Sequence, residues 1–178
     1  MRALLIIVIA SVTLAAQTAA PQVTSQDLLD GLKDPTKWLT YGGNYSGHRH
    51  SPLTQITPEN VNQLSAQWTF QTGTLGSFQT TPLVLDGVLY VTGFNNNAWA
   101  IDARSGRQIW RYRRELPEDL HLCCGTVNRG FAALGDRLFM TTADAHLLAL
   151  DMKTGGILFD VRMRTTRSGT PPPSPRSS

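Results

Sequence analysis

The stretches AIDARSGRQIW (residues 100–110) and ALDMKTGGILF (residues 149–159) are two copies of one pattern, and they decide the fold. Each copy contains an aspartate, then a Ser or Thr, then a glycine, and it closes on an aromatic residue. Aspartate and hydroxyl side chains bond the nearby backbone and glycine accepts a positive φ, so the middle of each copy predicts a tight turn. The closing aromatic, Trp110 in the first copy, suits packing between stacked sheets.

The repeat extends outward from these copies at a constant offset of 49 residues. The matched pairs include Leu89 with Leu138, Tyr90 with Phe139, and Thr92 with Thr141. Each unit reads as a hydrophobic strand, a polar turn and then the quoted pattern. A period in the forties or near fifty, built from short strands, is typical of a β-propeller. The sequence therefore predicts an all-β fold, a partial β-propeller of about two blades.

Two turns place hairpins at equivalent positions in the two units. Residues 81–92 contain two apolar runs about an Asp-Gly turn, and residues 134–140 repeat this pattern with Gly-Asp at the turn. Residues 67–72 alternate as a strand would, with Trp68 and Phe70 on one face. Trp68 is then expected to close an earlier, partial unit.

The part of the chain before the repeats predicts little regular structure. Residues 22–35 favour a short N-terminal helix that ends at Pro35. Its expected cap is Thr24 or Ser25, and its apolar stripe is formed by Leu28, Leu29 and Leu32. A single helical turn is expected after Thr57, ending near Leu64.

The histidines are not predicted to bind a metal. His48 and His50 have no Cys or carboxylate close by to complete a site, so a loop or structural role is favoured. His146 lies at the position of the polar connector 95–97 in the first unit. It is therefore interpreted as a turn or loop residue and not as a catalytic base.

The two cysteines of the chain, Cys123 and Cys124, are neighbours between the two repeats, in CCGTVNRG. Consecutive Cα atoms are about 3.8 Å apart, whereas ordinary disulfides prefer about 4.4–6.8 Å. A bond between the two would close a small, strained ring. The residues alone leave two alternatives: this strained disulfide, or two unpaired or intermolecular thiols.

Export favours the first alternative. Residues 1–20 have a positive start, an apolar run and small residues, which indicates a secretory signal peptide, with an uncleaved anchor as the alternative. Exported cysteines enter a compartment where disulfides persist. The formal charge of +3 includes Arg2 of this leader and the four arginines from Arg162 onward, so the rest of the chain carries −2 and predicts no nucleic-acid surface.

Residues 164–178 hold Arg, Pro, Ser, Thr and Gly and predict a disordered tail. The abrupt change from repeat to tail is interpreted as the mark of a shifted reading frame or a shortened gene. The chain thus divides into a signal peptide (1–20), an N-terminal helix and irregular arm (21–66), the propeller repeats (67–163) and the tail (164–178).

Five stretches together resemble the N-terminal part of the pyrroloquinoline quinone (PQQ)-dependent alcohol dehydrogenases, which are quinoproteins related to methanol and ethanol dehydrogenases. The resemblance covers about residues 27–163, and its most specific feature is the adjacent cysteines followed by Asn-Arg-Gly. The matching stretches are residues 38–64, TTPLVLDGVLYVT, AIDARSGRQIWRY, CCGTVNRGFA and TADAHLLALDMKTG. The resemblance implies a share of an eight-bladed quinoprotein propeller with the quinone and a calcium ion bound near its axis.

The resemblance also implies the cofactor-binding residues. Cys123 and Cys124 match the vicinal disulfide whose flat ring lies against one face of PQQ. Arg129 matches the arginine that contacts the cofactor, with a surface ion pair as its alternative role. Gln79 falls where the family usually has a glutamate, and an amide keeps the hydrogen bonding but loses the charge.

The implied function is periplasmic oxidation of alcohols by hydride transfer to the quinone, with an electron acceptor such as a cytochrome c. The family's calcium ligands and catalytic base come from later blades, so no catalytic or metal-binding residue is assigned, and Asp102 and Asp151 are interpreted as turn residues. The chain alone is therefore expected to be inactive. Two alternatives are a non-enzymatic propeller scaffold of the cell envelope and a sugar dehydrogenase that uses the same cofactor.

Overall fold

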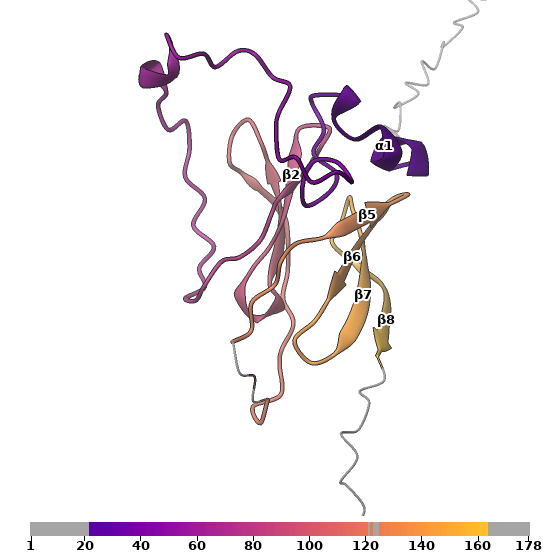
Figure 1. The fold of residues 1–178 in the computed structure, drawn as a ribbon. Helices are drawn as coiled ribbons and strands as arrows, with labels where there is room; N and C mark the ends of the chain where they lie inside the picture. The colour runs from indigo at the N-terminus through magenta and orange to yellow at the C-terminus, as the bar shows by residue number, and fades with distance from the viewer. Residues whose placement is uncertain (1–21, 121, 123–124, 164–178) are drawn as a thin grey trace, which may run out of the picture.

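The strands form two four-stranded antiparallel sheets, which lie side by side in Figure 1. The computed structural model describes residues 22–120, 122 and 125–163. The two sheets confirm the predicted all-β partial propeller. Sheet 1 contains β1 (Leu83–Leu85), β2 (Val88–Thr92), β3 (Ala98–Asp102) and β4 (Gln108–Tyr112), and sheet 2 contains β5 (Ala132–Leu134), β6 (Arg137–Thr141), β7 (His146–Asp151) and β8 (Ile157–Arg162).

The 49-residue repeat holds for the backbone pairing as well as for the sequence. In sheet 1, Ala100 pairs with both Tyr90 and Trp110, and in sheet 2 Ala149 pairs with both Phe139 and Phe159. The register of the last strand pair shifts just after the central alanine in both sheets. Each sheet is therefore one complete unit of the repeat.

The predicted Asp turns connect the last two strands of each sheet. Asp102 Oδ1 accepts hydrogen bonds from the Ser105 N–H and hydroxyl, both at 2.7 Å. Asp151 Oδ1 accepts the equivalent bonds from the Thr154 N–H at 2.7 Å and hydroxyl at 2.8 Å. The bonds from Ser105 lower the pKa of Asp102. Both carboxylates are therefore occupied as turn acceptors, as the sequence predicts.

The main apolar core lies between the two sheets. Trp110, only 7% exposed, extends from β4 to sheet 2, where its indole N–H donates to the carbonyl of Met152 at 2.9 Å. Its ring meets Gly155, where an added Cβ would lie 2.7 Å from Trp110 Cδ2. Tyr90 packs beside Trp110, and burial together with the charges of nearby aspartates raises the pKa of Tyr90 to about 12. The closing tryptophan thus joins the sheets, as predicted.

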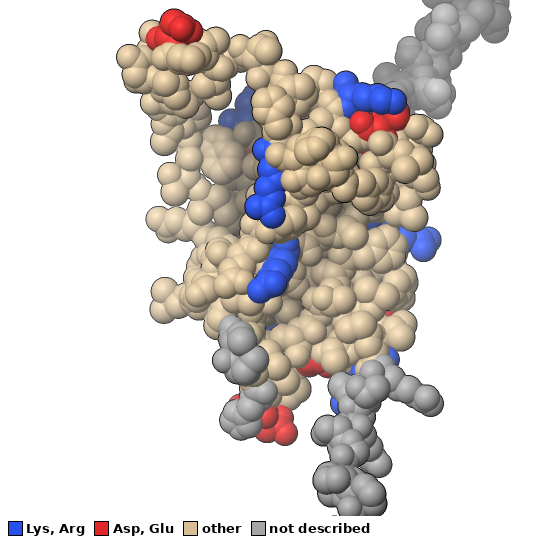
Figure 2. Space-filling model, in the orientation of Figure 1, with Lys and Arg blue, Asp and Glu red and all other residues tan. Residues whose placement is uncertain are grey.

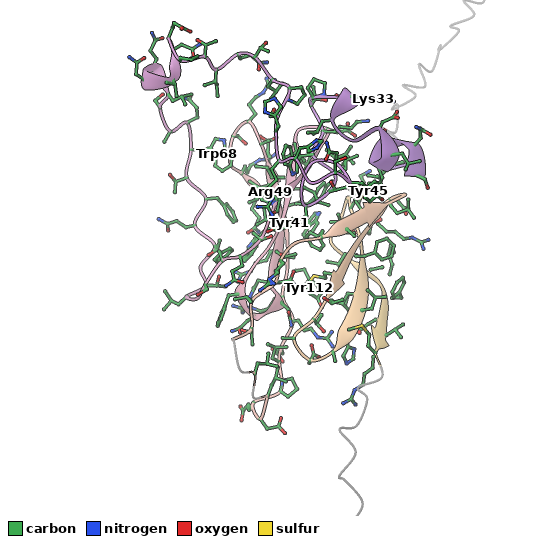
Figure 3. The ribbon with its side chains drawn as sticks, in the orientation of Figure 1. Lys33, Tyr41, Tyr45, Arg49, Trp68 and Tyr112 are labelled. Atoms are coloured by element: carbon green, nitrogen blue, oxygen red, sulfur yellow. The ribbon has the colours of Figure 1, made fainter. Side chains whose placement is uncertain are left out.

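The opposite face of sheet 1 is covered by the segment of residues 67–78. Phe70 meets Trp99 edge to face, and the indole N–H of Trp68, labelled in Figure 3, donates to the Ala103 carbonyl at 3.1 Å. The prediction that residues 67–72 form a strand is wrong, because this segment pairs with no strand among the described residues. Side chains, rather than ladder hydrogen bonds, hold it against sheet 1.

An ion-pair network connects the end of β4 to sheet 2. Arg114 binds Asp144 with Nη2 at 2.7 Å and Asp160 with Nη1 at 2.8 Å. His146 Nδ1 lies 2.5 Å from Asp160. Arg114 and Asp144 are only 13% and 12% exposed. His146 is the first residue of β7, where it pairs with Arg162 of β8, so its predicted loop position is wrong. Strand β7 therefore begins one residue earlier than the equivalent strand β3.

The N-terminal helix is shorter than predicted. Helix α1 (Ser25–Asp30) continues into a 3-10 turn, η1 (Gly31–Lys33), and ends before Pro35. Thr24 caps it as expected, in a reciprocal pair of hydrogen bonds with Asp27. Leu28 packs against the core, but Leu29 is 68% exposed and is not part of an apolar stripe.

The flanking segments fix this N-terminal region to both sheets. Val23 pairs with Gly135 next to β5, and Trp38 pairs with Val84 of β1. The expected turn before Leu64 is the 3-10 helix η2 (Val61–Gln63), and a further one, η3 (Phe94–Asn96), follows β2. None of the helices in the described part of the chain is long and apolar enough to cross a bilayer. The predicted leader and tail lie outside the described residues.

Candidate functional site

Two of the four predicted site residues lie together at the start of the two sheets. Gln79 precedes β1 and Arg129 precedes β5, so the repeat brings them to neighbouring positions. Arg129 Nη2 donates to Gln79 Oε1 at 3.3 Å. The other two, Cys123 and Cys124, lie outside the described residues, and their pairing stays a prediction.

The backbone around Arg129 is held by the segment before β1 on one side and by the end of β6 on the other. The Arg129 carbonyl accepts a hydrogen bond from the Thr81 N–H at 3.4 Å. Gly130 has φ 125°, and a Cβ there would lie 2.9 Å from the Thr81 carbonyl oxygen, so a side chain at this position does not fit. Asn128 is buried and donates to the Thr141 carbonyl at 2.8 Å, while its Oδ1 accepts from the Gly130 N–H. These bonds fix the direction in which Arg129 leaves the backbone.

Arg129 faces two hollows in the surface. One, of about 330 Å³, is lined by residues 127–130 of the loop and residues 141–143 at the end of β6. The other, of about 340 Å³, has a more apolar lining that includes Phe131, Phe139 and Leu147. Arg129 therefore contributes to a recess of mixed polarity and to a more apolar one.

The charge of Arg129 is not neutralised within the described part of the chain. The ion pairs found there use Lys33, Lys37, Arg114, Arg137 and His146. Arg129 instead contacts the neutral amide of Gln79, so its alternative role in a surface ion pair has no support among the described residues. On the face drawn in Figure 2, basic side chains lie along the middle and also at the upper right, where they adjoin an acidic one.

The remaining candidates do not join this site. The stretch holding His48 and His50 is irregular and exposed. Arg49 between them lies over the Tyr41 ring, 4.8 Å from its centroid, and both residues are labelled in Figure 3. The described residues contain no cluster of three or more His, Cys, Asp or Glu side chains suited to a metal ion. The polar site is thus built from Arg129, Gln79 and the segments that hold them.

Sequence reasoning gave no role to the asparagines around the site. Asn128 belongs to the quoted Asn-Arg-Gly signature, and its spacing of two residues from Gly130 is the signal for a side chain that bonds its own backbone. Asn95, Asn96 and Asn97 were predicted only as a polar connector. Their contacts reach residues 31 and 47 positions away, which no local pattern reveals.

Comparison with known proteins identifies the family. Residues 38–160 match the model of the PQQ family described as glucose/ethanol/alcohol dehydrogenase, beta-propeller domain. The chain belongs to the PQQ-dependent alcohol dehydrogenase family. This match includes both sheets, Gln79 and Arg129, and it confirms the family resemblance of the sequence.

Relatives within the PQQ-dependent family are similar over most of this chain. It is 39% identical to a 1-butanol dehydrogenase (quinone) of Thauera butanivorans, over 96% of this chain and 28% of that protein. The quinohemoprotein alcohol dehydrogenase ADHIIG of Pseudomonas putida HK5 superimposes with a TM-score of 0.78 at 35% identity, over 84% of this chain and 22% of that one. A europium-containing methanol dehydrogenase gives 0.72 at 32% identity, over 79% and 25%. The chain therefore spans about a quarter of the length of these PQQ-dependent relatives.

Proposed function

We propose that this chain forms one wall of the PQQ site in a periplasmic enzyme that oxidises alcohols. The observation that carries the proposal is the position of Arg129: its guanidinium lies at the start of both sheets, beside Gln79, with no carboxylate partner in the described residues. The membership of the chain in the PQQ-dependent family supplies the ligand that this cation would bind.

The residues present fit such a cofactor. A guanidinium fork binds carboxylates through parallel hydrogen bonds, and the quinone carries carboxylates at its edge. Gln79 accepts a hydrogen bond from the guanidinium and so orients it. Because the Gln79 amide is neutral, it leaves the positive charge of Arg129 in place, whereas a glutamate would cancel it. Cys123 and Cys124, as a vicinal disulfide, would stack against one face of the ring. When bound, PQQ accepts the hydride that leaves the alcohol.

The rest of the reaction is proposed from the family. A calcium ion beside the quinone is expected to take its ligands from blades other than these two. The base that accepts the proton of the alcohol is expected to come from those other blades as well. Electrons would then pass to a periplasmic acceptor such as a cytochrome c. Within this wall, the task of the described residues is to bind and orient the cofactor.

PQQ binding tests the proposal directly. The purified chain is expected to bind PQQ, measured as quenching of tryptophan fluorescence, and Arg129→Ala is expected to weaken binding about 10-fold to 100-fold, because a charged hydrogen-bond partner is lost. Arg129→Lys keeps the charge but not the fork and should give an intermediate dissociation constant.

Arg137→Ala is the matched control, since Arg137 is an exposed arginine of sheet 2 that pairs only with Asp136 among the described residues. It should bind PQQ as the unmodified chain does. The proposal is refuted if the unmodified chain does not bind PQQ, or if Arg129→Ala binds as tightly as the Arg137 control.

A polypeptide of these 178 residues is expected to bind PQQ without turning over substrate, because it spans only about a quarter of its relatives. Purified chain supplied with PQQ and calcium should reduce an artificial dye no faster with ethanol than without it. Alcohol-dependent reduction well above the protein-free blank would contradict this expectation.

A further inference from the structure

Three consecutive asparagines after β2 make a turn with an unusual backbone. Asn95 and Asn96 have φ values of 56° and 53°, so two adjacent residues are left-handed. Asparagine adopts this conformation more readily than other residues with a Cβ. The turn projects the three side chains in different directions, and each reaches a different partner.

Asn95 connects this turn to the loop that carries Arg129. Its N–H donates to the Thr126 carbonyl at 3.0 Å, and the Thr126 hydroxyl donates back to Asn95 Oδ1. Thr126 is three residues before Arg129. The pair of bonds therefore holds the loop against sheet 1 close to the predicted cofactor residues.

Asn96 and Asn97 anchor the turn itself. Asn96 is fully buried, and its Oδ1 accepts from the N–H of Ala143, which lines one of the hollows beside Arg129. Asn97 accepts from Arg111 Nη2 at 2.9 Å and donates to the Phe94 carbonyl at 2.8 Å. Because the turn is fixed to both sheets, Asn95 is a rigid support and not a flexible contact.

The loop is thus held on two sides. Asn95 binds it from sheet 1 through Thr126, and Thr141 of sheet 2 binds it through Asn128. Arg129 follows directly after the second of these contacts. A loop that is already fixed loses less conformational freedom when a ligand binds, so the protein binds that ligand with higher affinity.

We propose that Asn95 and Thr126 are positioning residues, which hold the loop so that Arg129 faces the cofactor. This inference rests on the proposed function for the identity of the ligand. The contact between Asn95 and Thr126 lies within the protein and does not involve the ligand. Neither side chain is required to touch PQQ.

The experiment removes the side-chain bond without disturbing the backbone. Thr126→Val has the same shape but lacks the hydroxyl, and Asn95→Gly keeps the left-handed conformation but lacks the oxygen. Thr126→Ser retains the hydroxyl and Asn95→Asp retains the oxygen, so these two should rescue binding. Asn60→Gly is the matched control, because Asn60 also makes two hydrogen bonds but lies in the arm, at η2.

Two measurements are made on each variant: the dissociation constant for PQQ, and the rate of trypsin cleavage after Arg129, identified by mass spectrometry. We expect Thr126→Val and Asn95→Gly to weaken PQQ binding and accelerate cleavage, each about threefold to tenfold. The double variant should be no worse than the more affected single variant. The rescue variants and Asn60→Gly should match the unmodified chain.

The inference is overturned if neither single variant changes cleavage after Arg129, or if the two changes add fully in the double variant. The cleavage rate tests the positioning of Arg129 separately from the binding of PQQ. If the unmodified chain bound no PQQ, the proposed function would fail, and the cleavage rates alone would decide whether this contact holds Arg129.

Discussion

Replacing Trp110 with alanine should lower the free energy of unfolding by about 3–5 kcal/mol, the range for large aromatic residues removed from a core. Trp110 is 7% exposed and makes the contact that joins β4 to the Asp151 turn of sheet 2. Its removal leaves a cavity between the sheets and leaves the Met152 carbonyl without its indole donor. Urea unfolding followed by circular dichroism measures the loss.

Two further variants show where the energy comes from. Trp110→Phe introduces the residue found at the equivalent position 159, so it loses the indole N–H but keeps an aromatic ring. It should lower the free energy of unfolding by about 1 kcal/mol. Trp68→Ala removes the same type of hydrogen bond from the segment of residues 67–78. Because Trp68 is less buried than Trp110, this change should cost less than half as much as Trp110→Ala. Equal losses for Trp68→Ala and Trp110→Ala would contradict the assignment of Trp110 as the inter-sheet contact.

The fold was predictable because residues close together in each repeat determine its turns and strands. The pattern around Asp102 names the turn acceptor, the hydroxyl donor and the glycine within five residues, and the structure uses all three. The constant offset of 49 residues then transfers every strand of sheet 1 to sheet 2. A periodic sequence leaves little choice of register.

The errors occur where partners rather than local patterns decide the structure. Residues 67–72 alternate correctly, and Phe70 does face sheet 1, but a strand also needs a neighbour to bond. Leu29 fits a helical stripe, yet the helix spans only six residues and packs through Leu28. Hydrophobic spacing predicts which side is apolar and not what covers it.

The candidate site was predictable only in part. The family signature located Arg129 and Gln79, and the structure brings the two side chains together. The asparagines that hold the loop act across separations of 13 and 31 residues. Arg114 similarly joins Asp144 and Asp160, which are 30 and 46 residues away. Such contacts depend on how the two sheets pack, which single residues do not encode.

Replacing Arg114 with leucine should destabilise the protein by about 3 kcal/mol at pH 7, because it leaves a carboxylate in a largely buried position without its partner. Asp144 is only 12% exposed. Burial alone would raise its pKa, but hydrogen bonds from Arg114 and Thr142 outweigh burial and lower the pKa of Asp144 from 3.8 to about 2. The same guanidinium lowers the pKa of Asp160.

This depressed pKa predicts how the loss depends on pH. A carboxyl group with a lower pKa in the folded state adds stability above its unfolded pKa, here about 2 kcal/mol, and this stability disappears as the pH falls from 3.8 towards 2. The unmodified protein should therefore lose stability in acid faster than Arg114→Leu does. The difference between the two should narrow between about pH 5 and pH 2.

Urea unfolding at several pH values measures this difference, and Arg137→Leu is the control. Arg137 pairs with Asp136 at 3.4 Å, but both side chains are about half exposed, so this change should cost less than about 1 kcal/mol. An effect of Arg114→Leu that is independent of pH would show that its side chain acts through packing alone. An effect as small as that of Arg137→Leu would show that the network does not hold the two sheets together.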